Sequence, residues 1–207
     1  MSRFRFLKYT TIALGALTLS GCVSLLPEVE PVAVYRLSSP EPRANATMPE
    51  AVVVTVERPV APAGLSGDEI AIETEPGRLA YMAGARWIAP STVILQSLIV
   101  DTLHAGEDGI EPVRPSDAIR GSYELRTDLR AFEAVYDQGS DRAPLVRVRI
   151  AARLVESDGR NLAASEVFSA EVRARANRAG AIVDAFNQAS TQVATEMSAW
   201  TGATANR

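Results

Sequence analysis

Two long segments in the second half of the chain alternate between apolar and mostly charged residues. From Tyr123 to Ala131 and from Val146 to Leu154, every second side chain is apolar, apart from Thr127. A period of two is typical of a β-strand with one face in the core and the other in water. Ser157-Asp158-Gly159-Arg160 then predicts a hairpin turn into a third strand, Leu162–Arg175. The pattern therefore predicts a three-stranded antiparallel meander.

Two other segments repeat apolar residues every three or four positions, which predicts amphipathic helices. The first begins at Pro90 and Ser91 and ends at Gly106. The second runs from about Ala179 to Trp200, and the residues from Thr201 onward are expected to fray. The apolar side chains of the two helices are Ile94, Leu95, Leu98, Ile99 and Leu103 in the first, and Ile182, Phe186, Ala189, Val193, Met197 and Trp200 in the second.

The first half of the chain contains shorter strand-like segments between loops rich in Pro and Gly. The predicted strands are Ala33–Leu37, Ala51–Glu57, Glu69–Thr74, Arg78–Met82 and the edge strand Ile110–Val113. The many valines of Ala51–Glu57 predict burial on both faces. Ser38–Pro49 and Pro59–Gly67 are predicted loops, and Glu75-Pro76-Gly77 a turn. The expected fold is a single α+β domain, a mixed or antiparallel sheet with two helices packed on one face.

The N-terminus has a different pattern, that of a secretory signal. Positive residues precede a short apolar run, Thr11–Leu19, which is shorter than the about 20 residues that span a bilayer. Leu19-Ser20-Gly21-Cys22 then resembles the bacterial lipobox, which implies cleavage between Gly21 and Cys22 and a covalent lipid on the Cys22 thiol. The alternative is an ordinary signal followed by a chance cysteine. Because Cys22 is the only cysteine, it would then be a lone thiol in an oxidising compartment, and the lipobox is favoured.

These boundaries divide the chain into a signal peptide (1–21), a lipidated tether (22–32), a domain (33–201) and a tail (202–207). Several acyl chains on Cys22 would anchor the protein stably without a spanning segment. Val23 and Ser24 follow the cysteine, whereas Asp at the next position resembles an inner-membrane retention signal in enterobacterial lipoproteins. The expected location is therefore the periplasmic face of the outer membrane.

Charge and side-chain chemistry narrow the classes of function. The net charge is −4, and loss of Arg3, Arg5 and Lys8 with the signal leaves −7, which argues against generic nucleic-acid binding. The single histidine, His104, cannot build a zinc site, and the sequence has neither a P-loop nor a G-x-S-x-G elbow. A hydrolase built on a carboxylate pair stays open, although scattered surface acids explain the same residues. We expect no enzymatic activity, no metal, and no cofactor besides the lipid on Cys22.

Blocks spread over nearly the whole mature chain resemble the ABC-type transport auxiliary lipoproteins, the PqiC-like family. The most characteristic stretch is Arg78–Trp87, which runs directly into the first predicted helix. The other blocks are Tyr35–Pro40 with its Tyr-x-Leu-x-x-Pro pattern, Arg58-Pro59, Leu65, Asp68-Glu69-Ile70, Leu154-Val155 and Phe168-Ser169-Ala170. Their order, their spacing and the lipobox together carry the resemblance.

The resemblance implies a non-enzymatic outer-membrane component of an envelope lipid transport system. The implied partners are an MCE-domain protein with a separate permease and ATPase. A ring of several copies is one arrangement that the resemblance implies. Tyr81, Arg86 and Trp87 are the candidate partner contacts, with Gly84 supplying a turn, because Tyr, Arg and Trp are favoured at interface hot spots. The alternative is that Tyr81 and Trp87 pack in the core. A regulator of peptidoglycan synthesis or a secretin pilot is the alternative function, since similar small folds serve both.

Overall fold

The computed structural model describes residues 31–41 and 51–207. The signal peptide, Cys22 and most of the tether lie outside the described residues, as does most of the predicted loop Ser38–Pro49. The strands are β1 (Ala33–Tyr35), β2 (Val52–Val56), β3 (Glu69–Glu75), β4 (Arg78–Trp87), β5 (Ile110–Val113), β6 (Tyr123–Val135), β7 (Leu145–Glu156) and β8 (Leu162–Arg173). The helices are α1 (Ala63–Ser66), α2 (Ser91–Ala105), the 3-10 turn η1 (Pro115–Asp117) and α3 (Ala179–Ala205).

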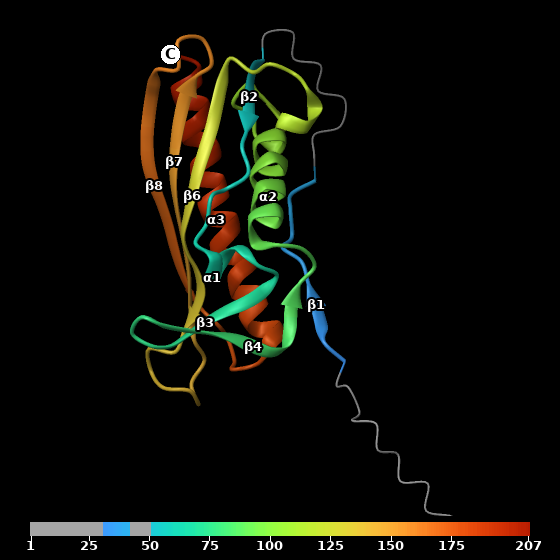
Figure 1. Cartoon of the computed structure of the whole chain (residues 1–207), viewed down its shortest axis with the longest axis vertical. Coiled ribbons are helices and arrows are strands. Elements are labelled where there is room, and N and C mark those ends of the chain that lie inside the picture. Colours follow the sequence, from blue (N-terminus) through green and yellow to red (C-terminus); the bar gives the residue numbers. More distant parts are fainter. Residues whose placement is uncertain (1–30, 42–50) are drawn as a thin grey trace, which may run out of the picture. The chain divides into compact units, whose positions relative to one another are not determined.

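The long strand β6 organises a mixed sheet (Figure 1). One edge of β6 pairs antiparallel with β7 along its whole length, and β7 pairs antiparallel with β8. The other edge is shared by two branches, because β2 pairs parallel with Tyr123–Leu125 and β3 pairs parallel with Ala134 and Val135. The first branch continues to β5, and the second continues to β4 and β1. The predicted α+β fold, the antiparallel meander and the edge position of β5 are confirmed.

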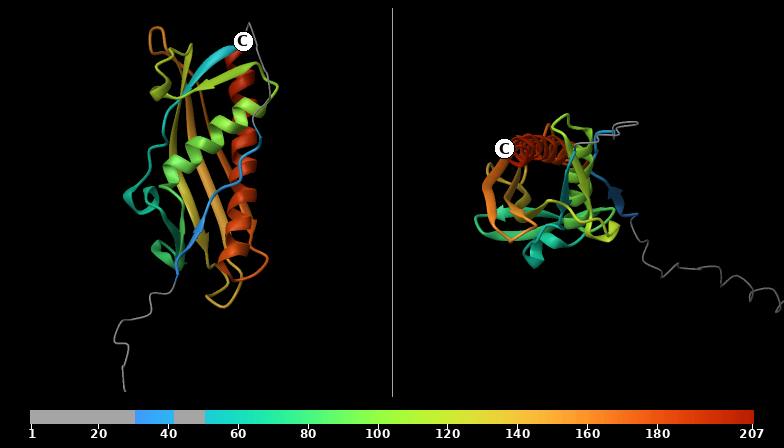
Figure 2. Two further views of the ribbon diagram at one scale, coloured as in Figure 1. Left: turned by 90° about the vertical axis from the view of Figure 1, so that its right-hand side faces the viewer. Right: turned by 90° about the horizontal axis from the view of Figure 1, so that it is seen from above.

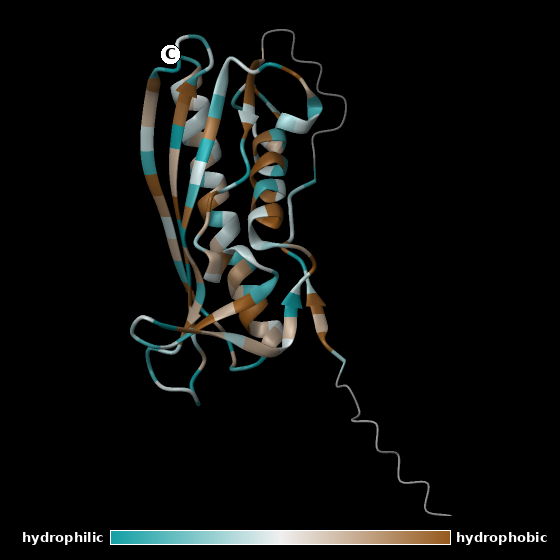
Figure 3. Cartoon of the chain, in the orientation of Figure 1, coloured by the Kyte–Doolittle hydropathy of each residue, from teal (hydrophilic) through white to brown (hydrophobic). Residues whose placement is uncertain are grey.

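Two helices, α2 and α3, pack beside each other on one side of the sheet (Figure 2), as predicted. Their apolar stripes and the apolar faces of the strands form one core, and polar residues alternate with them along the outer strands (Figure 3). Three fully buried rings lie at its centre: Trp87 of β4, Phe132 of β6 and Phe186 of α3, with ring centroids 4.8–5.5 Å apart. The same core also includes buried side chains of β2, so helix α3 shares one core with both branches of the sheet.

The predicted fraying after Thr201 is wrong. Helix α3 continues to Ala205, and the side chains of Thr201, Thr204 and Ala205 are buried. A Cβ at Gly202 would lie only 2.3 Å from the Cβ of Asp108, so the absence of a side chain at this position lets the helix end pack against the loop before β5. Asn206 then donates its side-chain amide to the Asp108 carbonyl, 2.7 Å away.

Several other elements differ from their predicted form. The predicted loop Pro59–Gly67 contains the short helix α1, and β4 extends past its predicted end at Met82 to Trp87. Gly84 lies inside β4 with a φ of 68°, in an irregular stretch where Tyr81 and Arg86 oppose Ala71 and Glu69 of β3. Strand β2 is fully buried only at alternate residues, because the helices α2 and α3 cover one side of the sheet.

Candidate functional site

Of the three predicted contact residues, Trp87 lies in the core. Its side chain is fully buried and packs edge-on against Phe186. A side chain without exposed surface cannot contact a partner in this fold, so the contact role predicted for Trp87 is wrong and the alternative, core packing, holds. Trp87 follows the register of β4, in which Ala85 and Trp87 point inward and Arg86 points outward.

Tyr81 and Arg86 remain at the surface. The Tyr81 ring is about half exposed, and its hydroxyl lies 3.4 Å from the Gly64 carbonyl of α1 as a long hydrogen bond. Arg86 is exposed and forms an ion pair with Asp68 at 3.5 Å. Across the irregular stretch around Gly84, Tyr81 and Arg86 pair with Ala71 and Glu69, which are only two residues apart on β3. The structure therefore presents Tyr81 and Arg86 as two exposed side chains, whereas Trp87 is buried.

The charged residues of β6, β7 and β8 form ion pairs, both across strands and within β6. Arg153 pairs with Asp128 at 2.7 Å, and Asp128 also pairs with Arg130 at 3.3 Å. Arg147 lies near three carboxylates, those of Glu171 (2.8 Å), Glu73 (3.8 Å) and Glu133 (3.9 Å). Exposed ion pairs contribute little stability each, so these networks fix side-chain positions more than they hold the fold together.

Glu133 is the carboxylate of this network that lies deepest. Burial raises its pKa above the usual value, against the opposing effects of the hydrogen bond from the Phe132 N–H and of the nearby Arg147 guanidinium. Its exposed fraction is only 7%. The same arrangement raises the pKa of Arg147, chiefly through its hydrogen bond to Glu171. Glu133 is thus the described carboxylate whose charge is most costly in this fold.

We expect Glu133→Gln to change how stability depends on pH. Because the pKa of Glu133 is raised in the folded state, the folded protein binds more protons than the unfolded chain. The contribution of Glu133 to the free energy of unfolding therefore falls as the pH rises above about 4.5. In Glu133→Gln the free energy of unfolding should decrease less with rising pH, and the variant should be at least as stable as the wild type at pH 7. Urea unfolding from pH 4 to pH 8 measures this. Glu171→Gln, on the exposed side of the same arginine, is the control, and a steeper fall in Glu133→Gln would contradict the assignment.

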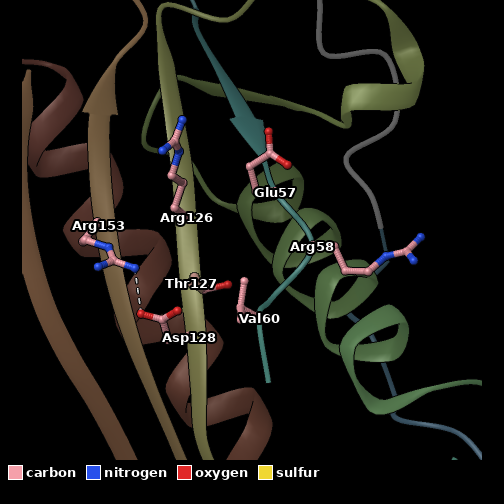
Figure 4. A pocket seen from close by; sticks show the side chains of 7 residues that line it. All are labelled: Glu57, Arg58, Val60, Arg126, Thr127, Asp128 and Arg153. Atoms are coloured by element: carbon pink, nitrogen blue, oxygen red, sulfur yellow. Dashed lines mark hydrogen bonds and ion pairs between the residues drawn. The ribbon is translucent and has the colours of Figure 1, made fainter. Parts of the chain in front are cut away.

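A pocket of about 470 Å³ opens between the start of β6 and the segment that follows β2 (Figure 4). Its lining residues are Glu57, Arg58, Val60, Arg126, Thr127, Asp128 and Arg153. The sequence pattern places Arg126, Asp128 and Arg153 on the polar face of the meander, but it gives no signal that Glu57–Val60 lies beside them. The isolated bridge between Val60 and Asp128 brings the two parts together.

The described residues hold no group of three or more His, Cys, Asp or Glu side chains placed to bind a metal ion. Over the same ranges, 31–41 and 51–207, no helix combines the length and apolar character needed to cross a bilayer. The lining of the pocket offers arginine donors, two carboxylates and one hydroxyl. That chemistry is suited to binding a polar or charged group.

Comparisons with known proteins agree with this fold. A Xanthomonas campestris protein of the DUF330 family has a solved structure that is 27% identical, with a TM-score of 0.73, over 84% of this chain and 97% of that one. A solved structure described as an uncharacterized protein is 16% identical, with a TM-score of 0.67, over 83% of this chain and 99% of that one, and it shares the fold. No curated protein matches the chain in sequence.

The match to a family profile is more informative about function. The profile described as "ABC-type transport auxiliary lipoprotein component" covers residues 35–198, from β1 to the last third of α3. It therefore includes both branches of the sheet, both long helices and every residue that lines the pocket. The chain belongs to the family of ABC-type transport auxiliary lipoprotein components.

Proposed function

We propose that this protein is a non-enzymatic lipoprotein of the outer membrane that docks an MCE-type lipid transport assembly there. The single observation that carries the proposal is the family match over residues 35–198, which associates the chain with an ABC transport system. The lipobox at Cys22 supports anchoring on the periplasmic side, and Val23 and Ser24 support the outer membrane. The partners would be an MCE-domain protein with its permease and ATPase, and the docked form would be a ring of copies.

The surface chemistry is consistent with a docking role. Tyr81 exposes about half of its ring, and Arg86 exposes its guanidinium group beside Asp68. Both residue types anchor protein interfaces when a partner removes them from water. We propose Tyr81 and Arg86 as contacts with the MCE-domain partner, while Trp87 supports them from the core.

Capture from membranes tests the proposal. The mature lipoprotein, solubilised with its native membrane and carrying an affinity tag at the C-terminus, should recover an MCE-domain protein identified by mass spectrometry. Tyr81→Ala should lower this recovery at least about fivefold, because a truncated hot-spot residue typically costs more than about 1 kcal/mol of binding. Val167→Ala is the matched control, since Val167 is exposed to a similar extent on β8. Recovery of peptidoglycan synthases or a secretin in place of the MCE protein would refute the proposal.

A further inference from the structure

The outer face of β1 carries exposed apolar side chains. Val32 and Val34 are 50% and 53% exposed, whereas the alternate residues Tyr35 and Leu37 are more buried. Because successive side chains of a strand point to opposite faces, Val32 and Val34 share one face, the outer one. Strand β1 lies at the end of one branch of the sheet (Figure 1), where it pairs with β4. The strand that begins the described domain therefore presents an apolar face to the outside.

Ile88 extends this apolar surface onto the end of β4. The two strands pair in parallel, with Val34 opposite Arg86. The Ile88 N–H donates to the Tyr35 carbonyl at 2.7 Å, so the ladder continues one residue beyond β4. Since Trp87 points into the core, the next residue, Ile88, lies on the outer face, and it is 59% exposed. The β1 patch is defined as the side chains of Val32, Val34 and Ile88.

Two arginines border the β1 patch. Arg86 forms an ion pair with Asp68, which directly precedes β3, so its guanidinium group is held on the side of β4 away from β1. Arg36 is exposed, and the alternation after Val34 places it on the outer face. It forms no ion pair with another described residue. Aliphatic side chains next to such an arginine are typical of a surface that lies on lipid headgroups.

The length of chain between the β1 patch and Cys22 limits how far the patch can lie from a bilayer. Val32 is ten residues after Cys22, and a chain of this length spans at most about 36 Å when fully extended. Helix α3, with 27 residues, is itself about 40 Å long, so the other end of the domain can lie much farther from the lipid. A contact that is too weak to hold a free protein becomes effective when an anchor already keeps it close.

We propose that the β1 patch lies on the phospholipid surface of the membrane that holds the anchor. The proposal rests on the lipid attachment at Cys22 within the proposed function. Single exposed apolar residues are normal on protein surfaces, whereas a group of them marks an interaction site. The aliphatic side chains enter the boundary between headgroups and acyl chains, and the Arg36 guanidinium group donates to the phosphates. The contact shares no residue with the proposed docking contacts, Tyr81 and Arg86.

Fluorescence quenching of the mature lipoprotein in vesicles tests the proposal. Since the Cys22 thiol carries the lipid and the chain has no other cysteine, Val34→Cys introduces a unique reactive thiol for a dye. The vesicles contain phosphatidylethanolamine, some phosphatidylglycerol and a nitroxide-labelled phosphatidylcholine. The dye at position 34 should be quenched at least about threefold more than the same dye on Val167→Cys, because an interfacial side chain lies about 5–10 Å into the headgroup boundary. Val167 is the matched control, since it is 55% exposed and lies on β8.

A second pair of variants, each combined with the dye at position 34, tests the apolar contact itself. Ile88→Ser should lower the quenching at least about twofold, because it removes one of the apolar side chains that leave water at the bilayer. Leu162→Ser should leave the quenching unchanged, since Leu162 is also 59% exposed but lies on β8. Both substitutions are at exposed residues, so circular dichroism should show a folded domain in each case.

The vesicles contain no other protein, so the result does not depend on the proposed MCE partner. Flotation with the vesicles is measured first, and protein that does not float would overturn the anchoring at Cys22 together with this proposal. Protein that floats but is quenched equally at positions 34 and 167 would overturn the bilayer contact alone. Weak lipid quenching at position 34 combined with protection from aqueous iodide would also overturn it, and would indicate that a second copy covers the patch.

Discussion

Trp87→Ala should destabilise the domain by about 3–5 kcal/mol, the usual cost of truncating a large buried aromatic side chain. The Trp87 ring is fully buried and contacts the rings of Phe132 and Phe186, with centroids 5.5 and 5.3 Å away. The substitution would leave a cavity where a strand of one sheet branch, the long strand β6 and helix α3 meet. Because natural domains are stable by only about 5–15 kcal/mol, this loss would remove a large share of the free energy of unfolding. Urea unfolding followed by circular dichroism measures the loss.

Two comparisons isolate the packing effect. Tyr81→Ala removes an exposed aromatic of the same strand and should change stability by less than about 1 kcal/mol. Trp87→Phe should cost less than Trp87→Ala, since the Trp87 indole N–H has no hydrogen-bond partner among the described residues and a second ring refills most of the space. If Trp87→Ala lost no more stability than Tyr81→Ala, the core assignment of Trp87 would be wrong.

Cys22→Ala should abolish lipid attachment and with it the function of the protein. The thiol is the atom that the lipobox resemblance assigns to the lipid, and the chain has no second cysteine to replace it. We expect no incorporation of labelled palmitate and at least about a tenfold loss from the outer-membrane fraction, because stable anchoring requires the acyl chains. The domain from β1 to α3 should stay folded, since its hydrophobic core is built from side chains between Leu37 and Ala205.

Ser20→Ala provides the control for Cys22→Ala, since it keeps a small residue in the lipobox and leaves the cysteine intact. This variant should be lipidated and active like the wild type. Complementation of a deletion strain by each variant gives the functional result. Full activity of a secreted, unlipidated form would show that the anchor is dispensable.

Periodicity predicted those elements whose environment is uniform along their length. Helix α2 begins and ends where its sequence predicts, because Pro90 and Gly106 bound a continuous apolar face. The meander of β6, β7 and β8 was predicted because one face is apolar and the other charged. Its turn over Ser157–Arg160 was also predicted, and the positive φ angles lie at Gly159 (85°) and Arg160 (56°).

Irregularities within strands could not be predicted from alternation. The register of β6 against β7 shifts between Leu129 and Ala131, and one extra residue turns the following side chains to the opposite face. Phe132 therefore points into the core, whereas the alternation that begins at Tyr123 assigns it to the polar face. Because Gly84 interrupts the regular alternation with a positive φ, the sequence pattern likewise does not show that β4 continues to Trp87.

The candidate sites likewise combine features that the sequence pattern predicts with features that only the fold reveals. Exposure of Arg126 and Arg153 followed from alternation, but their direct opposition depends on the register between β6 and β7. The approach of Glu57–Val60 depends on a parallel pairing between segments far apart in the chain, for which one sequence carries no signal. Residue type alone pointed to Trp87 as a contact, and burial, which only the fold reveals, assigned it to the core.

The shared edge of β6 has a consequence for the order in which the protein folds. Strands β7 and β8 and helix α3 follow β6 with short connections, so this half forms through local contacts. By contrast, β2 and β3 pair with β6 residues about 60 to 70 positions later in the chain, and closing loops of this length is slow. We therefore expect the C-terminal half to form first as a template, and the N-terminal strands to be the last to join it and the first to leave on unfolding.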